Sequence, residues 1–268
     1  MNNKSIPVIG VPIVNGVHWL KKLILSIDYP VDNLFIINNN GRGEIDKELE
    51  DLKEEHKNNS LIKNIYISHF PSNLGCPASW NLIIKSYLME PYWVICSHDV
   101  SFTPGLLEEI AITAEDKELA MIHPHAANYD LGSYDLFVIT EKGVNTIGLF
   151  DENFYPAYGE DVDFIMRIHN LKPKMVKGLK NIHKHGDEIA QANDEHYWAN
   201  AQQTAKEEPK VGNKLDEVNK INFTYLKEKW GEDYNMVSPH WNPFRNGEFP
   251  QSYTTFNLDF VRKKYLGF

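Results

Sequence analysis

Short apolar runs rich in β-branched residues alternate with helical patterns through the first two-thirds of the chain. The apolar runs predict strands, and the segments between them place apolar residues at helical spacing. Alternation of this kind favours a mostly parallel sheet that is covered by helices on both faces. We therefore predict an α/β fold with a Rossmann-like sheet, and we expect ligands to bind beyond the carboxyl ends of its strands.

The predicted elements occupy definite stretches of the sequence. Strands are expected over 6–14, 34–37, 65–67, 92–96, 120–122, 136–139 and 174–178. Helices are expected over 17–27, 44–57, 77–89, 106–114, 191–208 and 214–230, with another beginning at residue 160. Because the composition turns polar-helical and aromatic late in the chain, we place a boundary near residue 190. Residues 1–190 would form the catalytic domain, and 191–268 a helical extension for acceptor or oligomer contacts.

The bulk composition narrows the class of partner. The chain has 268 residues and a formal net charge of −10, with 37 acidic against 27 basic side chains. An acidic protein is a poor partner for nucleic acid, whose phosphates require positive charge. If the ligand is an anion, it must be held locally by a metal ion, backbone amides or a few cations.

The cysteines and the apolar segments indicate the compartment. Cys76 and Cys96 do not form a metal-type pair, and two thiols do not make a disulfide framework. We expect both to be reduced core residues of a cytoplasmic protein. The first nine residues lack the pattern of a signal peptide, and no stretch approaches the ~20 apolar residues of a membrane helix. We therefore expect a soluble protein without a transmembrane segment.

Two segments contain residue types that bind divalent cations. Ser97-His98-Asp99 directly follows the predicted strand over 92–96. A carboxylate at the exit of a buried strand is costly unless it is paired or binds a cation, and Mg²⁺ or Mn²⁺ suits it. A simpler interpretation is that Asp99 caps a turn. His183 and His185 flank a lysine after another predicted strand, and the sequence leaves open which of them faces inward.

Acidic residues are concentrated between residues 151 and 163, where five carboxylates are interleaved with aromatic side chains. Glu160 and Asp161 begin a helical pattern. The helix dipole favours acidic residues there by roughly 0.3–1 kcal/mol, which is the structural interpretation. The functional interpretation is that a carboxylate is held over the cleft as a general base.

A tight turn precedes the helix predicted over 77–89. Gly75 permits the turn, and Pro77 begins a helix whose first amides would point toward the cleft. Asn81 lies one turn into this helix, on the face that could reach a ligand. The alternative is an ordinary loop-to-helix junction.

Together these segments resemble the inverting glycosyltransferases of family 2 with the GT-A fold, in the rhamnosyltransferase-like bacterial and viral branch. The resemblance extends from about residue 6 to residue 186, and its most specific part is 150–163. Asn15 ends a segment similar to the family's first strand. Asn38 stands where the family usually has an aspartate that reads the nucleotide base. Asp99 is similar to the last aspartate of the family's metal motif, whose first position is Ser97 here.

The resemblance implies specific roles. Asp161 would be the catalytic base, and Asp99 with His183 or His185 would hold Mn²⁺ or Mg²⁺. Nucleotide or substrate binding would involve Asn15, Asn38, Asn73, Gly75, Asn81, His98, Tyr158 and Glu160. Trp80, Trp93 and Tyr158 could stack on sugar or base, or belong to the core. The donor would be a UDP-, dTDP- or GDP-linked sugar and the acceptor a glycan or glycoconjugate, and a homo-oligomer stays open.

Two other functions compete with glycosyl transfer. A sugar-nucleotide nucleotidyltransferase would share the fold and the metal ion. It would normally have a basic, glycine-rich loop after its first strand, whereas residues 14–18 contain one glycine and neither Lys nor Arg. A degenerate, non-catalytic binding domain would explain the serine at position 97. The presence of both Asp99 and Asp161 argues against it.

Overall fold

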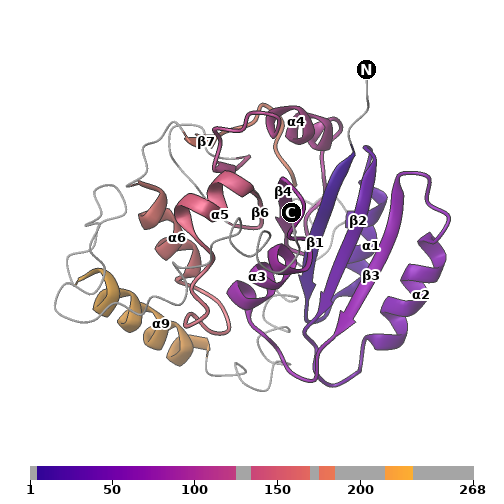
Figure 1. Ribbon diagram of the computed structural model, residues 1–268. Coiled ribbons are helices and arrows are strands. Elements are labelled where there is room, and N and C mark those ends of the chain that lie inside the picture. The colour runs from indigo at the N-terminus through magenta and orange to yellow at the C-terminus, as the bar shows by residue number, and fades with distance from the viewer. Residues whose placement is uncertain (1–4, 125–133, 170–174, 185–214, 232–268) are drawn as a thin grey trace.

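The computed structural model describes residues 5–124, 134–169, 175–184 and 215–231 (Figure 1). A seven-stranded sheet with the order β3-β2-β1-β4-β6-β5-β7 forms its centre. The strands are β1 (Ile6–Ile13), β2 (Val31–Asn38), β3 (Ile62–His69), β4 (Tyr92–Cys96), β5 (Met121–Ile122), β6 (Leu136–Thr140) and β7 (Val176–Lys177).

The sheet is mostly parallel, as the sequence predicts. Strands β3, β2, β1 and β4 are parallel to one another, and β5 is parallel to β7. Strand β6 runs antiparallel to both of its neighbours. The carboxyl ends of β1, β2, β3 and β4 therefore meet at one edge of the sheet, where the polar loops predicted to bind ligand begin.

Helices cover both faces of the sheet. They are α1 (Val17–Leu25), α2 (Asp46–His56), α3 (Cys76–Ser86), α4 (Leu106–Thr113), α5 (Glu141–Ile147), α6 (Glu160–His169) and α9 (Leu215–Trp230). Buried side chains of α1, α2 and α4 belong to one hydrophobic cluster, and those of α3, α5 and α6 to a second. On β1, a Cβ at Gly10 would lie 2.5 Å from Ile83, so a glycine lets α3 approach the sheet closely.

Helix α5 is the described helix that the sequence pattern does not predict. It is only seven residues long, which is too short for a clear helical period. Thr140 caps it by accepting a hydrogen bond from the Gly143 amide at 3.1 Å. A Cβ at Gly143 would lie 2.1 Å from the Ala120 carbonyl oxygen, so close packing against the sheet requires glycine there.

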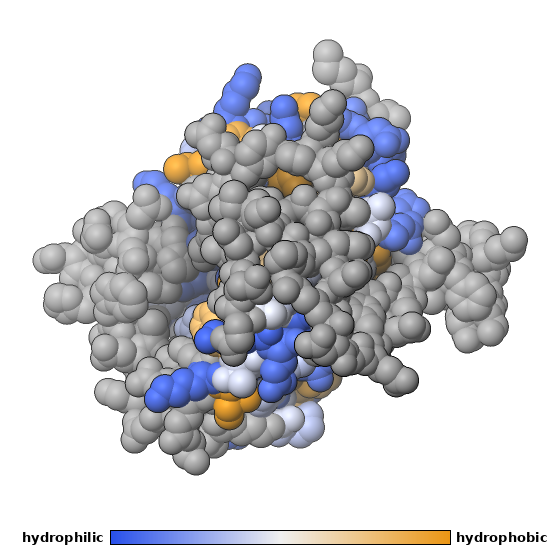
Figure 2. All heavy atoms as spheres, turned by 90° about the vertical axis from the view of Figure 1, so that its left-hand side faces the viewer, coloured by the Kyte–Doolittle hydropathy of each residue, from blue (hydrophilic) through white to orange (hydrophobic). Residues whose placement is uncertain are grey.

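Helix α9 corresponds to the helix predicted over 214–230, and it packs on α6 and the segment before it. Leu226 and Trp230, both fully buried, form a third hydrophobic cluster with Phe154 and Met166. Figure 2 views the molecule from the left-hand side of Figure 1, and the coloured side chains there are largely hydrophilic with scattered hydrophobic ones. The predicted helix over 191–208 lies outside the described residues.

No helix of the described chain is both long and apolar enough to cross a bilayer. Both cysteines are free thiols, as expected from the sequence.

Candidate active site

The asparagines that follow β2 bind neighbouring loops. Asn38 is buried, and its amide nitrogen lies 2.6 Å from the Asp46 carboxylate and 2.9 Å from His69 Nδ1. Asn40 donates to the Val14 carbonyl at 3.0 Å, which ties the end of β2 to the end of β1 beside the buried Asn15. The amides of Asn38 and Asn40 thus bind other groups of the protein, and these contacts hold the loops at this edge of the sheet.

The turn before α3 meets the loop before α6. Asn73 accepts a hydrogen bond from the Gly75 amide at 2.8 Å, and Gly75 has a φ of +84°. A Cβ at Gly75 would lie 2.9 Å from the Pro156 carbonyl oxygen, which also accepts from the Cys76 amide at 2.7 Å. Glycine is therefore required by both the backbone angle and the close approach.

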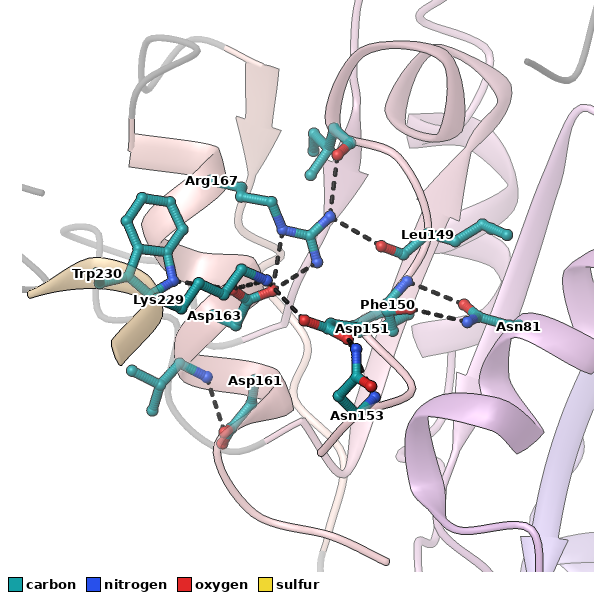
Figure 3. Close-up of polar contacts among 12 residues, drawn as sticks. Asn81, Leu149, Phe150, Asp151, Asn153, Asp161, Asp163, Arg167, Lys229 and Trp230 are labelled. Atoms are coloured by element: carbon teal, nitrogen blue, oxygen red, sulfur yellow. Dashed lines mark hydrogen bonds and ion pairs between the residues drawn. The ribbon is translucent and has the colours of Figure 1, made fainter. Parts of the chain in front are cut away.

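Asn81 fastens α3 to the loop after α5. Its amide nitrogen donates to the Phe150 carbonyl at 2.9 Å, and its oxygen accepts from the Phe150 amide at 2.9 Å (Figure 3). The same nitrogen lies 2.8 Å from Glu152 Oε1. Asn81 is 1% exposed, so its amide serves the loop that leads to α6.

A second group of polar side chains gathers beyond β4. Asp99 is buried and His98 half-buried in the loop that follows the strand. The Asp135 carboxylate lies 2.9 Å from His183 Nε2, and both side chains are buried. Burial raises the pKa of the Cys96 thiol, and the charges of Asp99 and Asp135 raise it further. Both carboxylates therefore lie near the same thiol, at the edge where a ligand is expected.

The described residues beyond β4 include one buried carboxylate, Asp99, and one buried imidazole, His183, that could contribute to binding a cation. No group of three or more His, Cys, Asp or Glu side chains that could hold a metal ion occurs within the described ranges. A cation such as Mg²⁺ needs only one or two protein carboxylates when phosphate oxygens and water complete its coordination. Two backbone hydrogen bonds of 2.8 Å between Ser101 and Lys184 hold His183 alongside the loop containing Asp99. His185 lies outside the described residues.

Two adjacent carboxyls, the buried Glu160 and the half-buried Asp161, begin α6. Glu160 is 5% exposed, and its Oε2 has no hydrogen-bond partner among the described residues. Burial and then the charge of Asp161 raise the pKa of Glu160 to about 8, against the opposing effect of backbone hydrogen bonds. Burial also raises the pKa of Asp161, whose Oδ1 accepts from the Val162 amide at 2.7 Å. Two adjacent carboxyls with raised pKa values are typical of functional sites.

The surroundings of this pair connect it to α3 and to β6. Burial and the charges of Glu160 and Asp161 raise the pKa of the Cys76 thiol, and the Cys76 amide donates to the Pro156 carbonyl of the loop before α6. Tyr158 precedes the pair with a φ of +73°, and its side chain is 49% exposed. Burial and the charge of Asp161 also raise the pKa of Tyr134, the residue next to Asp135. The charge of the predicted base thus acts on titratable groups of α3 and of the residue that precedes Asp135.

Trp80 and Trp93 belong to the core. Trp80 is 7% exposed and packs edge-on against Phe137 and Phe150. Trp93 is fully buried and donates to the Tyr87 carbonyl at 3.0 Å. Of the three aromatic residues considered for stacking, Tyr158 is the one with a substantially exposed ring.

A buried ionic cluster surrounds Asp163, which lies in α6 two residues after Asp161 (Figure 3). Lys229 of α9 lies 2.8 Å from Asp151 Oδ2 and 2.6 Å from Asp163 Oδ1. Arg167 lies 2.9 Å from Asp163 Oδ2, and Trp230 donates to Asp163 Oδ1 at 2.8 Å. Burial raises the pKa of Asp151, but the charge of Lys229 together with hydrogen bonds from Lys229, Asn153 and Tyr225 outweighs burial and lowers the pKa. Two cations thus balance two carboxylates whose side chains are almost fully buried.

Three polar residues of this region are absent from the sequence prediction. Asp135 immediately precedes β6, and a carboxylate at the entry of a buried strand is the signal that marks it. Asn222 and Lys229 lie in a helix whose sequence is mostly polar. Their spacing of four and three residues from Leu226 places them on the buried side of α9, which is detectable as helical periodicity.

Comparison with known proteins places this arrangement among glycosyltransferase folds. No family model matches the chain. A galactofuranosyl glycosyltransferase of Leishmania donovani is 23% identical, over an alignment covering 62% of this chain and 53% of that protein. The chain thus spans about half the length of this curated relative.

The structural similarity extends over most of the described architecture. Residues 1–349 of TarS from S. aureus superpose with a TM-score of 0.51 at 12% identity, covering 84% of this chain and 72% of that one. The same fragment in complex with UDP gives a TM-score of 0.51 at 10% identity, covering 83% and 72%. The chain therefore has the GT-A type of α/β fold that the sequence resemblance implies.

Proposed function

We propose that this protein transfers a glycosyl group from a nucleoside diphosphate sugar to an acceptor hydroxyl, with inversion at the anomeric carbon. The observation that carries the proposal is the pair of adjacent carboxyls at the start of α6, the buried Glu160 and the half-buried Asp161, whose pKa values are both raised. The pair lies beside the edge of a GT-A sheet, where α/β proteins bind ligands. The glycosyltransferase from L. donovani supports the reaction class.

The donor would lie beyond the carboxyl ends of β1, β2 and β4. The UDP complex of TarS supports a uridine diphosphate sugar, with dTDP- and GDP-linked sugars as alternatives. Asn15, the Asn73–Gly75 turn and the half-buried His98 border this edge. Asn38 would shape the base pocket through the loop it holds, since its amide already contacts Asp46 and His69.

A divalent cation, Mn²⁺ or Mg²⁺, would be held by Asp99 and His183. When bound, such a cation neutralises the negative charge that develops on the departing diphosphate. The 2.9 Å contact between Asp135 and His183 would orient the imidazole, as carboxylates commonly do for histidine ligands.

Asp161 would act as the general base. Its carboxylate takes the proton of the acceptor hydroxyl while that oxygen forms a bond to the anomeric carbon. The bond from the anomeric carbon to the diphosphate oxygen breaks in the same step, so a single displacement inverts the configuration. Burial raises the pKa of Asp161 toward the working pH, which strengthens it as a base.

The acceptor would be a sugar hydroxyl of a glycan or glycoconjugate. Tyr158 presents a half-exposed ring beside the pair of carboxyls, and an aromatic face suits packing against a sugar ring. Glu160 is the adjacent carboxyl and would hydrogen-bond a neighbouring hydroxyl of the acceptor. These contacts would orient the nucleophile toward the donor.

A panel of nucleotide sugars tests the proposal. Each donor is incubated with the protein and Mn²⁺, and released nucleoside diphosphate is measured with and without simple glycoside acceptors. We expect one class of donor to be consumed, faster with acceptor, and to raise the melting temperature by binding the native state. Release of pyrophosphate from a nucleoside triphosphate and a sugar phosphate would instead indicate a nucleotidyltransferase. Binding without turnover of any donor would indicate a degenerate domain.

A further inference from the structure

The turn before Glu160 is held by a side chain from α9. The amide nitrogen of Asn222 lies 2.7 Å from the Ala157 carbonyl oxygen and 3.0 Å from that of Tyr158. A longer contact of 3.4 Å reaches the Tyr155 carbonyl. Asn222 is 2% exposed, so these carbonyl groups depend on its amide in a place largely closed to water.

This turn has a conformation that needs support. Tyr158 has a φ of +73°, a left-handed conformation that is unfavourable for a residue with a Cβ. Gly159 follows with a φ of +97°, and a Cβ there would lie 2.8 Å from the Phe154 ring. Glu160 and Asp161 come next, so a shift of the turn moves both carboxyls.

A second residue of α9, Lys229, holds the chain on both sides of the turn. Lys229 binds Asp151, which precedes the turn, and Asp163, which follows it within α6. Asn222 binds carbonyl groups of residues 155–158, which lie between Asp151 and Asp163 in the sequence. Asn222 therefore fixes the centre of the turn, and Lys229 fixes its flanks.

We propose that Asn222 is a positioning residue that aligns Glu160 and Asp161 for glycosyl transfer by binding the carbonyl groups of the preceding turn. The proposal rests on the proposed function, and it makes α9 part of the catalytic apparatus. Asn222 acts through the backbone of residues 155–158.

Replacing Asn222 by Asp tests the role with little change in size. The carboxylate lacks a donor and would face carbonyl oxygens, so the turn should shift. We expect kcat to fall by about 10- to 100-fold, since misplacing a catalytic group by ~1 Å has effects of this size. The KM for the donor should change less than about twofold, because the donor lies beyond β1, β2 and β4. Asn222→Gln, which keeps the donor group, should recover part of the loss.

A matched control separates positioning from general stability. Leu226 is fully buried on the same helix, four residues from Asn222, and packs in the cluster of Phe154 and Trp230. Leu226→Val should lower the melting temperature and leave kcat within about twofold. Equal losses of kcat in Leu226→Val and Asn222→Asp at equal melting temperature would overturn the proposal.

A thiol assay tests the turn without any enzymatic activity. The chain has two cysteines. Cys76 is half-buried and its amide donates to the Pro156 carbonyl of the turn at 2.7 Å, whereas Cys96 is buried in the sheet. Asn222→Asp should raise the rate of Cys76 modification by a disulfide reagent on the order of tenfold, because opening the turn exposes the thiol. The rate for Cys96 should stay unchanged.

The outcomes distinguish this inference from the proposed function. Unchanged modification of Cys76, or equal acceleration at Cys96, would reject the role of Asn222. Selective acceleration at Cys76 in a protein that consumes no nucleotide sugar would reject glycosyl transfer, and would leave Asn222 as the residue that holds the turn. Selective acceleration together with the kcat loss supports both.

Discussion

Lys229 Nζ lies 2.6 Å from Asp163 Oδ1, and both side chains are fully buried. Arg167 binds the other oxygen of the same carboxylate, and Asp151 binds the same ammonium group. Buried charges are tolerated when they are paired and hydrogen-bonded, and here the signs balance. This contact joins α9 to α6 at the base of the candidate active site.

Replacing Lys229 by Met should destabilise the protein strongly. The change leaves two buried carboxylates with a single cation, and breaking a buried pair from one side costs about 3–5 kcal/mol. Chemical unfolding of the variant measures the loss. Lys227→Met is the matched control, because Lys227 is exposed on the same helix, and it should change stability by less than about 0.5 kcal/mol. Equal effects of the two substitutions would contradict the role of the cluster.

Glu160 should make the protein less stable as the pH rises. The pKa of Glu160 is about 8 in the folded protein against 4.5 ordinarily. Between these values the folded chain keeps a proton that the unfolded chain has released. The free energy of unfolding therefore falls with pH, by up to about 1.4 kcal/mol per unit from this group. Above the folded pKa of about 8, Glu160 is deprotonated in both the folded and the unfolded chain, so it no longer changes the free energy of unfolding with pH.

Glu160→Gln removes this titration, so its stability advantage over the wild type should grow from about pH 5.5 to about pH 7.5. Unfolding in denaturant at several pH values measures the difference. The matched control is Glu108→Gln, which removes an exposed carboxylate of α4. A difference between Glu160→Gln and wild type that stays constant over this range would contradict the raised pKa.

Removing the cation should abolish turnover. Asp99 is 7% exposed at the exit of β4, where a diphosphate would need a partner of positive charge. We expect treatment with EDTA to stop transfer, and Mn²⁺ or Mg²⁺ to restore it. Asp99→Asn should weaken cation binding, measured directly by calorimetry in the presence of UDP. Full turnover of the stripped enzyme would rule out the metal proposal.

Local sequence patterns predict the parallel part of the fold and the order of its elements. Strands such as Tyr92–Cys96 are continuous apolar runs, and the helices between them have regular apolar spacing. The reversal of β6 is not predicted, because the pattern identifies a strand without giving its direction. Helix α5 escapes detection because its seven residues owe their helical form to Thr140 and to contact with Ala120.

The candidate site likewise contains residues that local sequence patterns predict and residues that they do not. Asp161 and Glu160 are found from sequence because they begin a helix after an aromatic loop. Asn222 and Asp151 interact with partners more than sixty residues away, and such contacts form only when the chain has folded. Asn81 is predicted to bind ligand because it lies one turn into the helix after a recognisable turn. Its contacts with the Phe150 backbone, 69 residues away, cannot be predicted from that position.

Steady-state kinetics of Asp161→Asn test the central claim most directly. A general base contributes on the order of 10²–10⁴ in rate, so the variant should lose about that factor in kcat. Its affinity for the donor, measured separately by titration, should stay within about twofold of the wild type. Glu160→Gln is the comparison, because it alters the neighbouring carboxyl of the same pair, and it should retain more activity. Near-normal turnover of Asp161→Asn, together with a large loss in Glu160→Gln, would show that the base is not Asp161.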